Sequence, residues 1–448
     1  MRNSGIRRAA VLAGLLTLII HSAVFAQRTG FSREELAKRR AALMDHCGHG
    51  VIILFGDAAS PDAGHFRQDN DFFYFTGVED LNAVCVMVPE RKASYLFLPR
   101  QSDREKLFDG ANLLAIPDSK EKSGFTDILP LEHFDDILSR LYGRTAPVFH
   151  LRLSPRDSVG GSRSETLLFI GRRNRNHYND QITADNHRIR KIRENYPWAE
   201  LRDLTPFVDG MRVIKSAEEI EILRRNGRIS AESVKQAMLA GRPGAFEYEA
   251  EAAAVFVSLK SGAKGAAYPP IVGSGPNACV YHYEKNSRRI EDGDLVLMDY
   301  GADLDHLGMD ITRTWPANGK FSPEQREIYR TVLEVQKASI EACRPGATQE
   351  DVRKHVAEVM KKKGIDPRGL AGGLDHYVGM AVHDCGPYNE PLKEGMVFTV
   401  EPGLYYPEKN IGVRIEDTVL VTETGCEVLT KDVPKEIEEI ESFLRNRN

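Results

Sequence analysis

The sequence predicts a mixed α/β (α+β) protein, built from an amino-terminal α/β domain and a second, internally duplicated domain. Three observations lead to this prediction. The 448 residues are 42% hydrophobic and 28% charged, which is typical of a folded globular chain. The amino-terminal part mixes amphipathic stretches with short β-rich runs, and the carboxyl-terminal part repeats the order helix, helix, strand, strand.

The first 26 residues have the pattern of a cleaved secretory signal. Arg2, Arg7 and Arg8 precede an apolar run over residues 9–20, and the stretch 24–26 (Val-Phe-Ala) suits a signal peptidase. An uncleaved membrane anchor is the alternative, but the run is shorter than the roughly 20 apolar residues that span a bilayer. We therefore expect an exported protein, periplasmic or secreted, with no stable membrane insertion after cleavage.

The charge balance argues against a polyanion-binding protein. Lys and Arg total 60 against 65 Asp and Glu, a net charge of −5, and the sequence pI is about 6.3. The locally basic segment 172–193 has acidic flanks and no interleaved aromatic residues, so a solvated surface is the favoured interpretation. We expect no nucleic-acid partner.

Residues 27–206 form the first predicted domain. Its β-rich runs are predicted to be strands of one sheet. They cover residues 51–55, 72–75, 83–88 and 95–98.

Residues 207–448 form the second predicted domain, whose first half begins with a helix. Ser216 and Glu219 have the spacing of a capping box, and apolar residues recur after them at helical spacing. A further helix is predicted over 248–260, followed by strand-like runs over 294–300 and 309–315.

The same order then repeats. Ser322 and Pro323 begin a helix that runs to about residue 343, and Thr348 with Asp351 begins another that runs to about residue 363. Strand-like runs follow over 396–406 and 413–421. The repetition indicates a duplicated domain.

Six cysteines lie far apart in the sequence and form no closely spaced metal or redox pair. Cys85 and Cys279 lie in apolar runs and are predicted to be buried thiols. Because the chain is expected to be exported, zero to two disulfides are predicted, with no indication of the pairing. The six are Cys47, Cys85, Cys279, Cys343, Cys385 and Cys426.

Four carboxylates interrupt apolar strand runs, two in each half. Asp299 and Asp310 are eleven residues apart, and Glu401 and Glu416 are fifteen apart. A strand, loop and strand of that length can bring both members of a pair to one end of adjacent strands. A lone buried carboxylate costs several kcal/mol, so such groups persist when they bind a cation or accept many hydrogen bonds.

Two histidines lie between these pairs in the sequence. His376 and His383 can supply an imidazole ligand and a second, unligated imidazole. Oxygen ligands with one nitrogen suit two divalent ions, manganese foremost, with cobalt, zinc or iron as alternatives. Asp303 and Asp305 fall at the expected hairpin tip and are predicted to be solvated. Histidines without carboxylate neighbours are interpreted as structural: His46, His65, His133, His150, His177, His187, His306 and His355.

The ordered set Asp299, Asp310, His376, Glu401 and Glu416 resembles the five metal ligands of the pita-bread metallopeptidases. This family includes methionine aminopeptidase, prolidase and aminopeptidase P. The resemblance covers nearly the whole mature chain, and complete ligation argues against creatinase and the binding-only relatives. Its motifs are Leu297-Met298-Asp299-Tyr300-Gly301, Asp310-Ile311-Thr312-Arg313-Thr314, Val400-Glu401-Pro402-Gly403-Leu404-Tyr405 and Arg414-Ile415-Glu416-Asp417.

The segment 66–77 resembles the amino-terminal domain of aminopeptidase P more than that of prolidase. The resemblance implies a creatinase-like domain over 27–206, a pita-bread catalytic domain over 207–448, and release of an N-terminal residue that precedes proline. Prolyl bonds need a special site, because their tertiary amide has no N–H to donate and the ring restricts φ.

The same resemblance implies a role for each site residue. Asp299 and Asp310 hold one metal, Asp310 and Glu416 bridge to the second, and His376 and Glu401 complete the second. A metal-bridging hydroxide is the nucleophile, and Glu401 also relays its proton. His383 and His282 contact the peptide or the intermediate. Tyr405 and Arg414 match positions of the same pocket, and Asp71 is a candidate contact from the amino-terminal domain.

Two departures leave the substrate open. Gly372 stands where aminopeptidase P usually has a histidine, and the loop between His383 and Glu401 is short. The alternatives are a prolidase restricted to Xaa-Pro dipeptides, an aminopeptidase of broader specificity, and a non-catalytic peptide-binding module. The expected partners are peptides and, as is common in the family, further copies of the chain in a dimer or tetramer.

Overall fold

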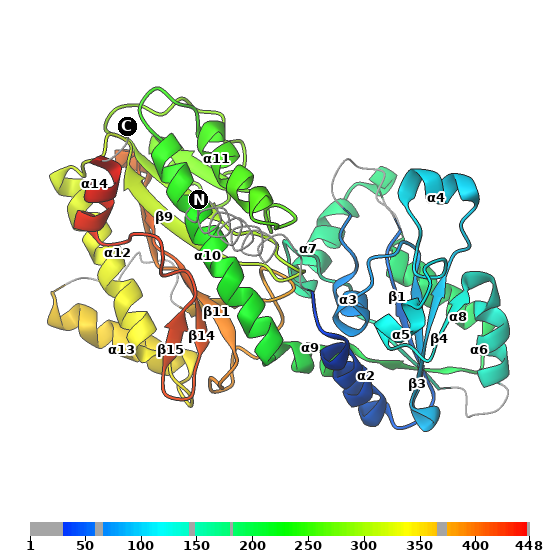
Figure 1. Cartoon of the computed structure of the whole chain (residues 1–448). Coiled ribbons are helices and arrows are strands. Elements are labelled where there is room, and N and C mark those ends of the chain that lie inside the picture. Colours follow the sequence, from blue (N-terminus) through cyan, green and yellow to red (C-terminus); the bar gives the residue numbers. More distant parts are fainter. Residues whose placement is uncertain (1–29, 59–65, 143–147, 180–181, 365–373, 446–448) are drawn as a thin grey trace, which may run out of the picture.

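The computed structural model describes residues 30–58, 66–142, 148–179, 182–364 and 374–445 (Figure 1). The expected signal sequence and Gly372 lie outside these residues. No helix within them has both the length and the apolar character needed to cross a bilayer. Two bodies lie side by side in Figure 1, and helices α9 and α10 connect them.

A six-stranded mixed sheet forms the centre of the amino-terminal domain, in the order β4-β3-β2-β1-β5-β6. Strand β1 pairs antiparallel with β2 and parallel with β5. The strands are β1 (Val51–Phe55), β2 (Val84–Val88), β3 (Ala93–Leu98), β4 (Asp127–Pro130), β5 (Val148–Leu151) and β6 (Glu200–Asp203). The helices are α2 (Arg33–Cys47), α3 (Asn70–Thr76), α4 (Asp103–Asp109), α5 (Ser119–Ser123), α6 (Phe134–Tyr142), α7 (Arg163–Arg173), α8 (Ala184–Asn195) and α9 (Thr205–Val213).

Both faces of this sheet are covered by helices. Alternate residues of a strand point to opposite faces, so Val51 and Ile53 pack with helices α6 and α8. Ile52 and Leu54 pack on the other face with α2 and α3. The predicted α/β architecture of the first domain is confirmed.

Residues 72–75 are helical, so the prediction of a strand there is wrong. They lie in α3, where the Asp69 side chain accepts a hydrogen bond from the Phe72 backbone N–H and Gly77 ends the helix in the left-handed region. A short apolar run has no periodicity that separates a buried strand from a buried helix. Here the Asp69 cap and the glycine seven residues after Asn70 decide the outcome.

The carboxyl-terminal domain begins with the predicted capped helix. The Ser216–Glu219 capping box is present at the start of α10, and the boxes at Ser322 and Thr348 are present as well. The helices are α10 (Ala217–Ala240), α11 (Glu247–Lys260), α12 (Pro323–Ala342), α13 (Gln349–Lys362) and α14 (Ile437–Arg445). The strands are β7 (Ile271–Ser274), β8 (Leu295–Tyr300), β9 (Ile311–Pro316), β10 (Leu374–Tyr377), β11 (Val397–Val400), β12 (Gly403–Tyr406), β13 (Ile411–Arg414), β14 (Asp417–Val421) and β15 (Cys426–Val428).

The strands form sheets that match the two predicted halves. The first half contributes β7-β8-β9 and the second contributes β10-β11-β14-β15, with β12-β13 as a separate hairpin. Each long strand-like run of the second half is broken in two, at Glu401-Pro402 and at Ile415-Glu416. Both breaks therefore fall at a candidate metal ligand, where the backbone leaves the ladder and the glutamate can turn toward the first half.

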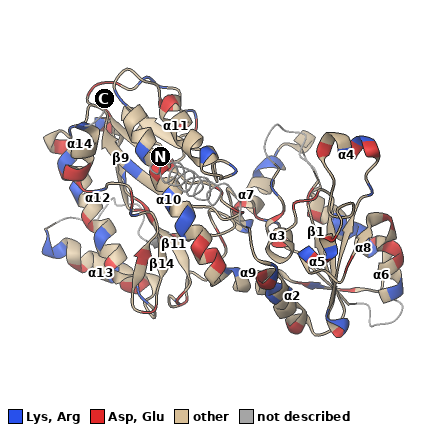
Figure 2. Cartoon of the chain, viewed as in Figure 1, with Lys and Arg blue, Asp and Glu red and all other residues tan. Residues whose placement is uncertain are grey.

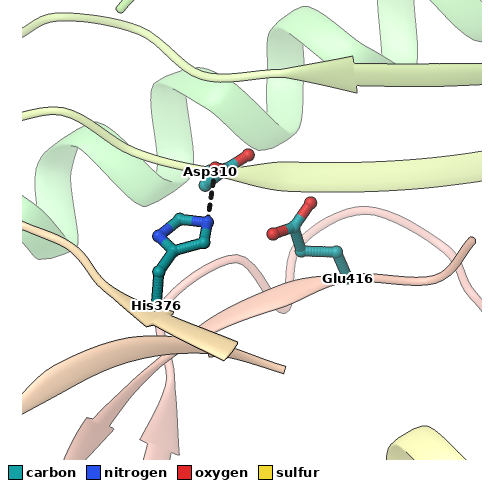
Figure 3. A group of neighbouring side chains, drawn as sticks. All are labelled: Asp310, His376 and Glu416. Atoms are coloured by element: carbon teal, nitrogen blue, oxygen red, sulfur yellow. Dashed lines mark ion pairs between the residues drawn. The ribbon is translucent and has the colours of Figure 1, made fainter. Parts of the chain in front are cut away.

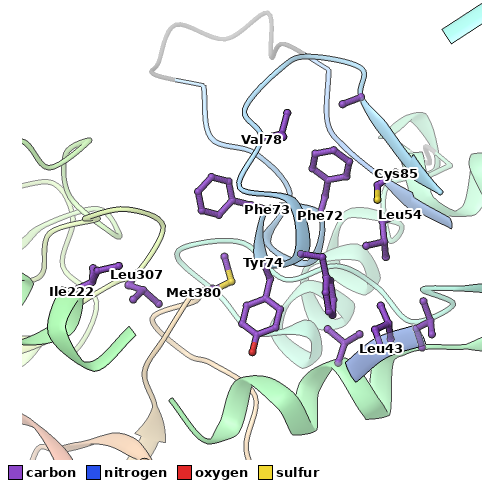
Figure 4. Packing of buried hydrophobic residues seen from close by; sticks show 14 of the residues in the cluster. Leu43, Leu54, Phe72, Phe73, Tyr74, Val78, Cys85, Ile222, Leu307 and Met380 are labelled. Carbon is purple, nitrogen blue, oxygen red and sulfur yellow. The ribbon is translucent and has the colours of Figure 1, made fainter. Parts of the chain in front are cut away.

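An apolar core joins the two domains (Figure 4). Phe73 and Tyr74 of α3 lie in the same buried cluster as Ile222 of α10, Leu307 and Met380. Polar contacts reinforce this interface. Arg67 donates to the Asp303 carboxylate at 2.7 Å and to the Met380 carbonyl at 2.8 Å.

Asp303 and Asp305 are buried, so the prediction that they are solvated is wrong. Their hairpin tip packs against the amino-terminal domain, an interface that the local sequence does not reveal. The charged residues on the helices of both domains are of mixed sign (Figure 2). The described basic residues between 172 and 193 are exposed or partly exposed, as expected for a solvated surface.

All six cysteines are free thiols in the structure. Cys85 is buried, as predicted, and burial raises the pKa of its thiol to about 12. Cys279 is only partly buried, so its predicted full burial is wrong.

Candidate metal centre

The five predicted ligands lie in or next to five different strands, and they converge between the two halves. Asp299 is in β8 and Asp310 lies one residue before β9. The chain between them turns tightly, since a Cβ on Gly301 would lie 1.6 Å from the Met309 carbonyl oxygen. A larger residue at 301 would therefore separate the two aspartates.

His376 and Glu416 reach this pair from the second half (Figure 3). Ligand atoms of Asp310, His376 and Glu416 all lie within 4.8 Å of one another. His376 Nε2 is 3.4 Å from Asp310 Oδ2 and 3.3 Å from Glu401 Oε1. The structure thus brings together all five predicted ligands, because Asp299 and Glu401 line the same cavity of about 190 Å³ as Asp310 and His376.

Burial and mutual repulsion dominate the electrostatics of this cavity. Burial, and then the neighbouring charge of Asp310, raise the pKa of Asp299 above its usual value. Burial and the charges of Asp310 and Glu401 raise the pKa of Glu416 well above its usual range. Burial acts to lower the pKa of His376, but its bonds to Asp310 and Glu401 outweigh this and raise it well above normal. The pocket therefore favours added positive charge.

The residues fit divalent metal ions. Glu416 Oε2 accepts a hydrogen bond from Thr312 Oγ1 at 2.6 Å, whereas Glu416 Oε1 is buried without a hydrogen-bond partner in the described part of the chain. An unpartnered buried carboxylate oxygen in an acidic cavity is typical of a cation ligand. Four carboxylates and one imidazole form a donor set for hard or borderline ions.

Arg414 and Tyr405 lie beside the metal-facing carboxylates. Arg414 Nη2 donates to Asp299 Oδ2 at 2.7 Å, and Arg414 Nη1 donates to the Tyr405 hydroxyl at 3.0 Å. Both residues line the cavity, where the sequence analysis predicted them. The guanidinium offsets part of the negative charge and orients Asp299.

Tyr268 is a site residue that the sequence analysis missed. Its hydroxyl donates to Asp299 Oδ1 at 2.5 Å and also contacts Asp310 Oδ1. It lies in an irregular segment, Ala266-Ala267-Tyr268-Pro269-Pro270, with no periodicity and no charge. Only its place beside the aspartates in the fold reveals it.

The predicted substrate histidines lie at the mouth of the cavity. His282 and His383 both line it, His282 is exposed, and the ring centroid of His383 is 4.0 Å from that of His376. Exposed Tyr281 stacks edge-on against Tyr405 there, with ring centroids 4.4 Å apart. These side chains are placed to contact a bound peptide rather than the metals.

Asp71 is not part of this cavity. It is 3% exposed and pairs with Arg152, Arg163 and Arg212 at 2.9, 2.9 and 3.0 Å. Burial acts to raise its pKa, but the arginine charges outweigh it and hold the pKa of Asp71 well below its usual range. These arginines occupy both oxygens of the carboxylate. The structure therefore does not support the predicted contact of Asp71 with substrate.

Glu165 is the amino-terminal carboxylate that reaches a predicted catalytic residue. Its Oε1 is 2.6 Å from His383 Nδ1. A second cavity of about 510 Å³ lies here, lined by Arg163, Glu165 and Asp209 from one side and by His376, His383 and Tyr388 from the other. It shares His376 and His383 with the metal cavity, so the two spaces adjoin.

Comparison with known proteins decides the family. Residues 221–423 match the model of metallopeptidase family M24, and residues 36–149 match the aminopeptidase P amino-terminal domain. The Xaa-Pro aminopeptidase of Escherichia coli K12 is 35% identical over 452 residues, covering 92% of this chain and 98% of that protein. The chain belongs to metallopeptidase family M24.

One solved structure and one further relative are similar to this M24 enzyme over most of its length. The structure of E. coli aminopeptidase P with the inhibitor Pro-Leu superposes with a TM-score of 0.78 at 31% identity, covering 94% of this chain and 99% of that one. The Xaa-Pro dipeptidase of Pyrococcus furiosus is 38% identical over 384 residues, covering 85% of this chain and 96% of that protein.

These similarities confirm the predicted fold class and the resemblance to aminopeptidase P. The enzyme is a metal-dependent aminopeptidase, and the prolidase alternative has less support.

Proposed function

We propose that this M24 enzyme is an Xaa-Pro aminopeptidase, which releases the N-terminal residue from peptides with proline in second position. One observation carries the proposal: the five candidate metal ligands converge at a cavity that adjoins a larger cavity walled by both domains. The larger space can receive residues beyond the scissile bond. This supports cleavage of peptides longer than the dipeptides taken by a prolidase.

Asp299, Asp310, His376, Glu401 and Glu416 would hold two divalent ions, with manganese the foremost candidate and cobalt, zinc or iron the alternatives. When bound, such ions acidify a coordinated water and polarise the scissile carbonyl. The donor set supports this choice, because hard and borderline ions prefer carboxylates with one imidazole.

Glu401 is placed to move a proton. Its Oε1 is 3.3 Å from His376 Nε2 and accepts from Thr399 Oγ1 at 2.9 Å. Burial acts to raise the pKa of Glu401, but its bond to His376 outweighs this and lowers it, so the carboxylate is available as a base. It would take the proton of the attacking water and pass it to the leaving prolyl nitrogen.

His282 and His383 would bind the peptide at the mouth of the cavity. Neither requires a donor on the second residue of the substrate, whose prolyl amide has no N–H. Hydrogen bonds from these imidazoles to the scissile carbonyl would strengthen as negative charge develops on its oxygen.

Two further proposals follow from the sequence. The pattern of residues 1–26 supports export to the periplasm or outside the cell. The common occurrence of dimers and tetramers in the family supports a homodimer or homotetramer. Fractionation of cells and light scattering of the purified protein would test these two proposals.

Hydrolysis of three peptides by the mature protein tests the proposed activity: an Xaa-Pro-Xaa tripeptide, an Xaa-Pro dipeptide and an Xaa-Ala-Xaa tripeptide, each with and without added manganese. Metal-dependent cleavage of the prolyl tripeptide is expected. Cleavage of the dipeptide alone would assign a prolidase. Equal or faster cleavage of the alanyl peptide would assign an aminopeptidase of broader specificity.

A further inference from the structure

The beginning of helix α7 fixes one carboxylate oxygen of Glu165 by hydrogen bonds. Glu165 is the third helical residue, and its Oε2 accepts from the Ser162 backbone N–H at 2.7 Å and from Ser162 Oγ at 2.9 Å. Arg163, two residues earlier, pairs with Asp71 and Asp209 at 2.9 and 2.8 Å. The capping box uses one carboxylate oxygen and leaves the other, Oε1, directed at His383.

The chain around His383 is attached to the same part of the amino-terminal domain. The Val382 backbone N–H donates to the Val159 carbonyl oxygen at 2.7 Å, beside the bond from His383 to Glu165. The next residue, Asp384, is 3% exposed and bonds to Arg212 Nη2 at 2.5 Å and Lys215 Nζ at 3.2 Å. Both neighbours of His383 are thus held, and Glu165 Oε1 lies 2.6 Å from its ring at Nδ1.

We propose that Glu165 is a positioning residue, which accepts the Nδ1 proton of His383 and thereby presents Nε2 to the peptide in the metal cavity. A carboxylate that accepts from one ring nitrogen determines both the tautomer and the ring orientation of a histidine. The amino-terminal domain would then take part in turnover through this one bond, in addition to walling the cavity. This inference rests on the proposed function of His383 as a peptide contact.

A kinetic comparison of four variants tests it. Glu165→Ala should lower kcat about 10- to 100-fold, with KM and metal content nearly unchanged. Glu165→Gln should recover at most part of the activity, because its single carbonyl oxygen cannot both complete the capping box with Ser162 and accept the Nδ1 proton, and its amide NH2 can only donate. The double variant Glu165→Ala/His383→Ala should be no slower than His383→Ala alone, because Glu165 acts through His383.

Glu105 provides a matched control. It is the third residue of α4 and forms the same capping box with Ser102, but at an exposed position. Glu105→Ala removes an equivalent cap and should leave kcat unchanged. A similar loss in Glu105→Ala and Glu165→Ala, or multiplicative losses in the double variant, would overturn the proposal.

A measurement without substrate separates this inference from the proposed function. In metal-loaded protein labelled with ¹⁵N-histidine, the ring signals absent from His383→Ala belong to His383. We expect a proton on Nδ1 in the parent protein and loss of this preference in Glu165→Ala. Wild-type protein that cleaves none of the three peptides would refute the proposed function. A protonation pattern of His383 that is the same with and without Glu165 would refute the positioning role.

Discussion

Two clusters of buried charge lie close together in this molecule, and they differ in how the charge is balanced. In the interdomain cluster, Asp69, Asp71, Asp157 and Asp384 pair with Arg152, Arg163, Arg212 and Lys215. In the metal cavity, Arg414 pairs with Asp299, and His376 pairs with Asp310 and Glu401.

The difference shows how a metal site can be told from a structural ion network. In the first cluster the arginines hold the pKa of Asp71 well below normal, whereas burial and like charges raise the pKa of Glu416 well above normal. Even Asp157 Oδ1, which has no hydrogen-bond partner among the described residues, is 3.9 Å from Arg163 Nη1. Glu416 has no ion pair with Lys, Arg or His in the described part of the chain. A deficit of positive charge, rather than acidity alone, marks the metal site.

The largest expected effect separates the two clusters by metal content. Asp310→Ala or Glu416→Ala should abolish both metal uptake and turnover, a loss of at least about 10⁴-fold, because water activation depends on the ions. Elemental analysis and peptide hydrolysis measure the two effects. His383→Ala should keep the metal while turnover falls. An active, metal-loaded Asp310→Ala protein would refute the assignment of the site.

In the balanced cluster, Asp71→Asn should destabilise the fold by about 3–5 kcal/mol, because three buried arginines lose their shared carboxylate. The folded pKa of Asp71 is depressed. Its stabilisation is therefore complete above the unfolded pKa of about 3.9 and is lost as the pH falls through the folded pKa. Calorimetry should show a constant difference from wild type between about pH 8 and 5, which narrows below about pH 4.

An exposed aspartate provides a control for Asp71→Asn. Asp103, whose side chain is fully exposed beside Lys106, should tolerate Asp103→Asn without a measurable change in Tm. If Asp71→Asn were equally mild, the network would add little to the stability of the interface.

In the acidic cavity, replacing a carboxylate by a neutral amide should stabilise the metal-free fold instead of destabilising it. The raised pKa of Glu416 means that folding of the metal-free protein takes up a proton at neutral pH. Glu416→Gln is already neutral and avoids this cost, so the metal-free protein should gain about 1–3 kcal/mol, or a few degrees in Tm. Wild-type protein should gain Tm on metal addition, whereas Glu416→Gln should gain little. Melting curves after chelation and after metal addition measure both. A drop in the metal-free Tm of Glu416→Gln would show that the cavity is balanced without metal.

The smallest expected effect concerns Arg414. Tyr405→Phe removes the hydroxyl that accepts from Arg414 but leaves the Arg414–Asp299 pair, so kcat should fall about 10-fold with metal retained. Tyr329→Phe also deletes a buried tyrosine hydroxyl, one that donates to the Lys435 carbonyl at 2.8 Å, and should not change kcat. Equal kcat values for the two variants would show that the Tyr405 hydroxyl has no role in turnover.

The sequence alone determined the fold class, the duplicated domain and the five candidate metal ligands. Each depends on local information: capping boxes at Ser216, Ser322 and Thr348, and charged residues placed in apolar strands where burial demands a partner. The motifs around Asp299 and Glu401 add a family likeness that the comparisons confirm.

Only the tertiary structure decided the rest. Asp303 is buried because Arg67 of the other domain reaches it. Tyr268 and Glu165 contact the site across 31 and 218 residues of sequence. Such pairings depend on how two domains and two halves pack together, and no periodicity or local spacing of the chain encodes them.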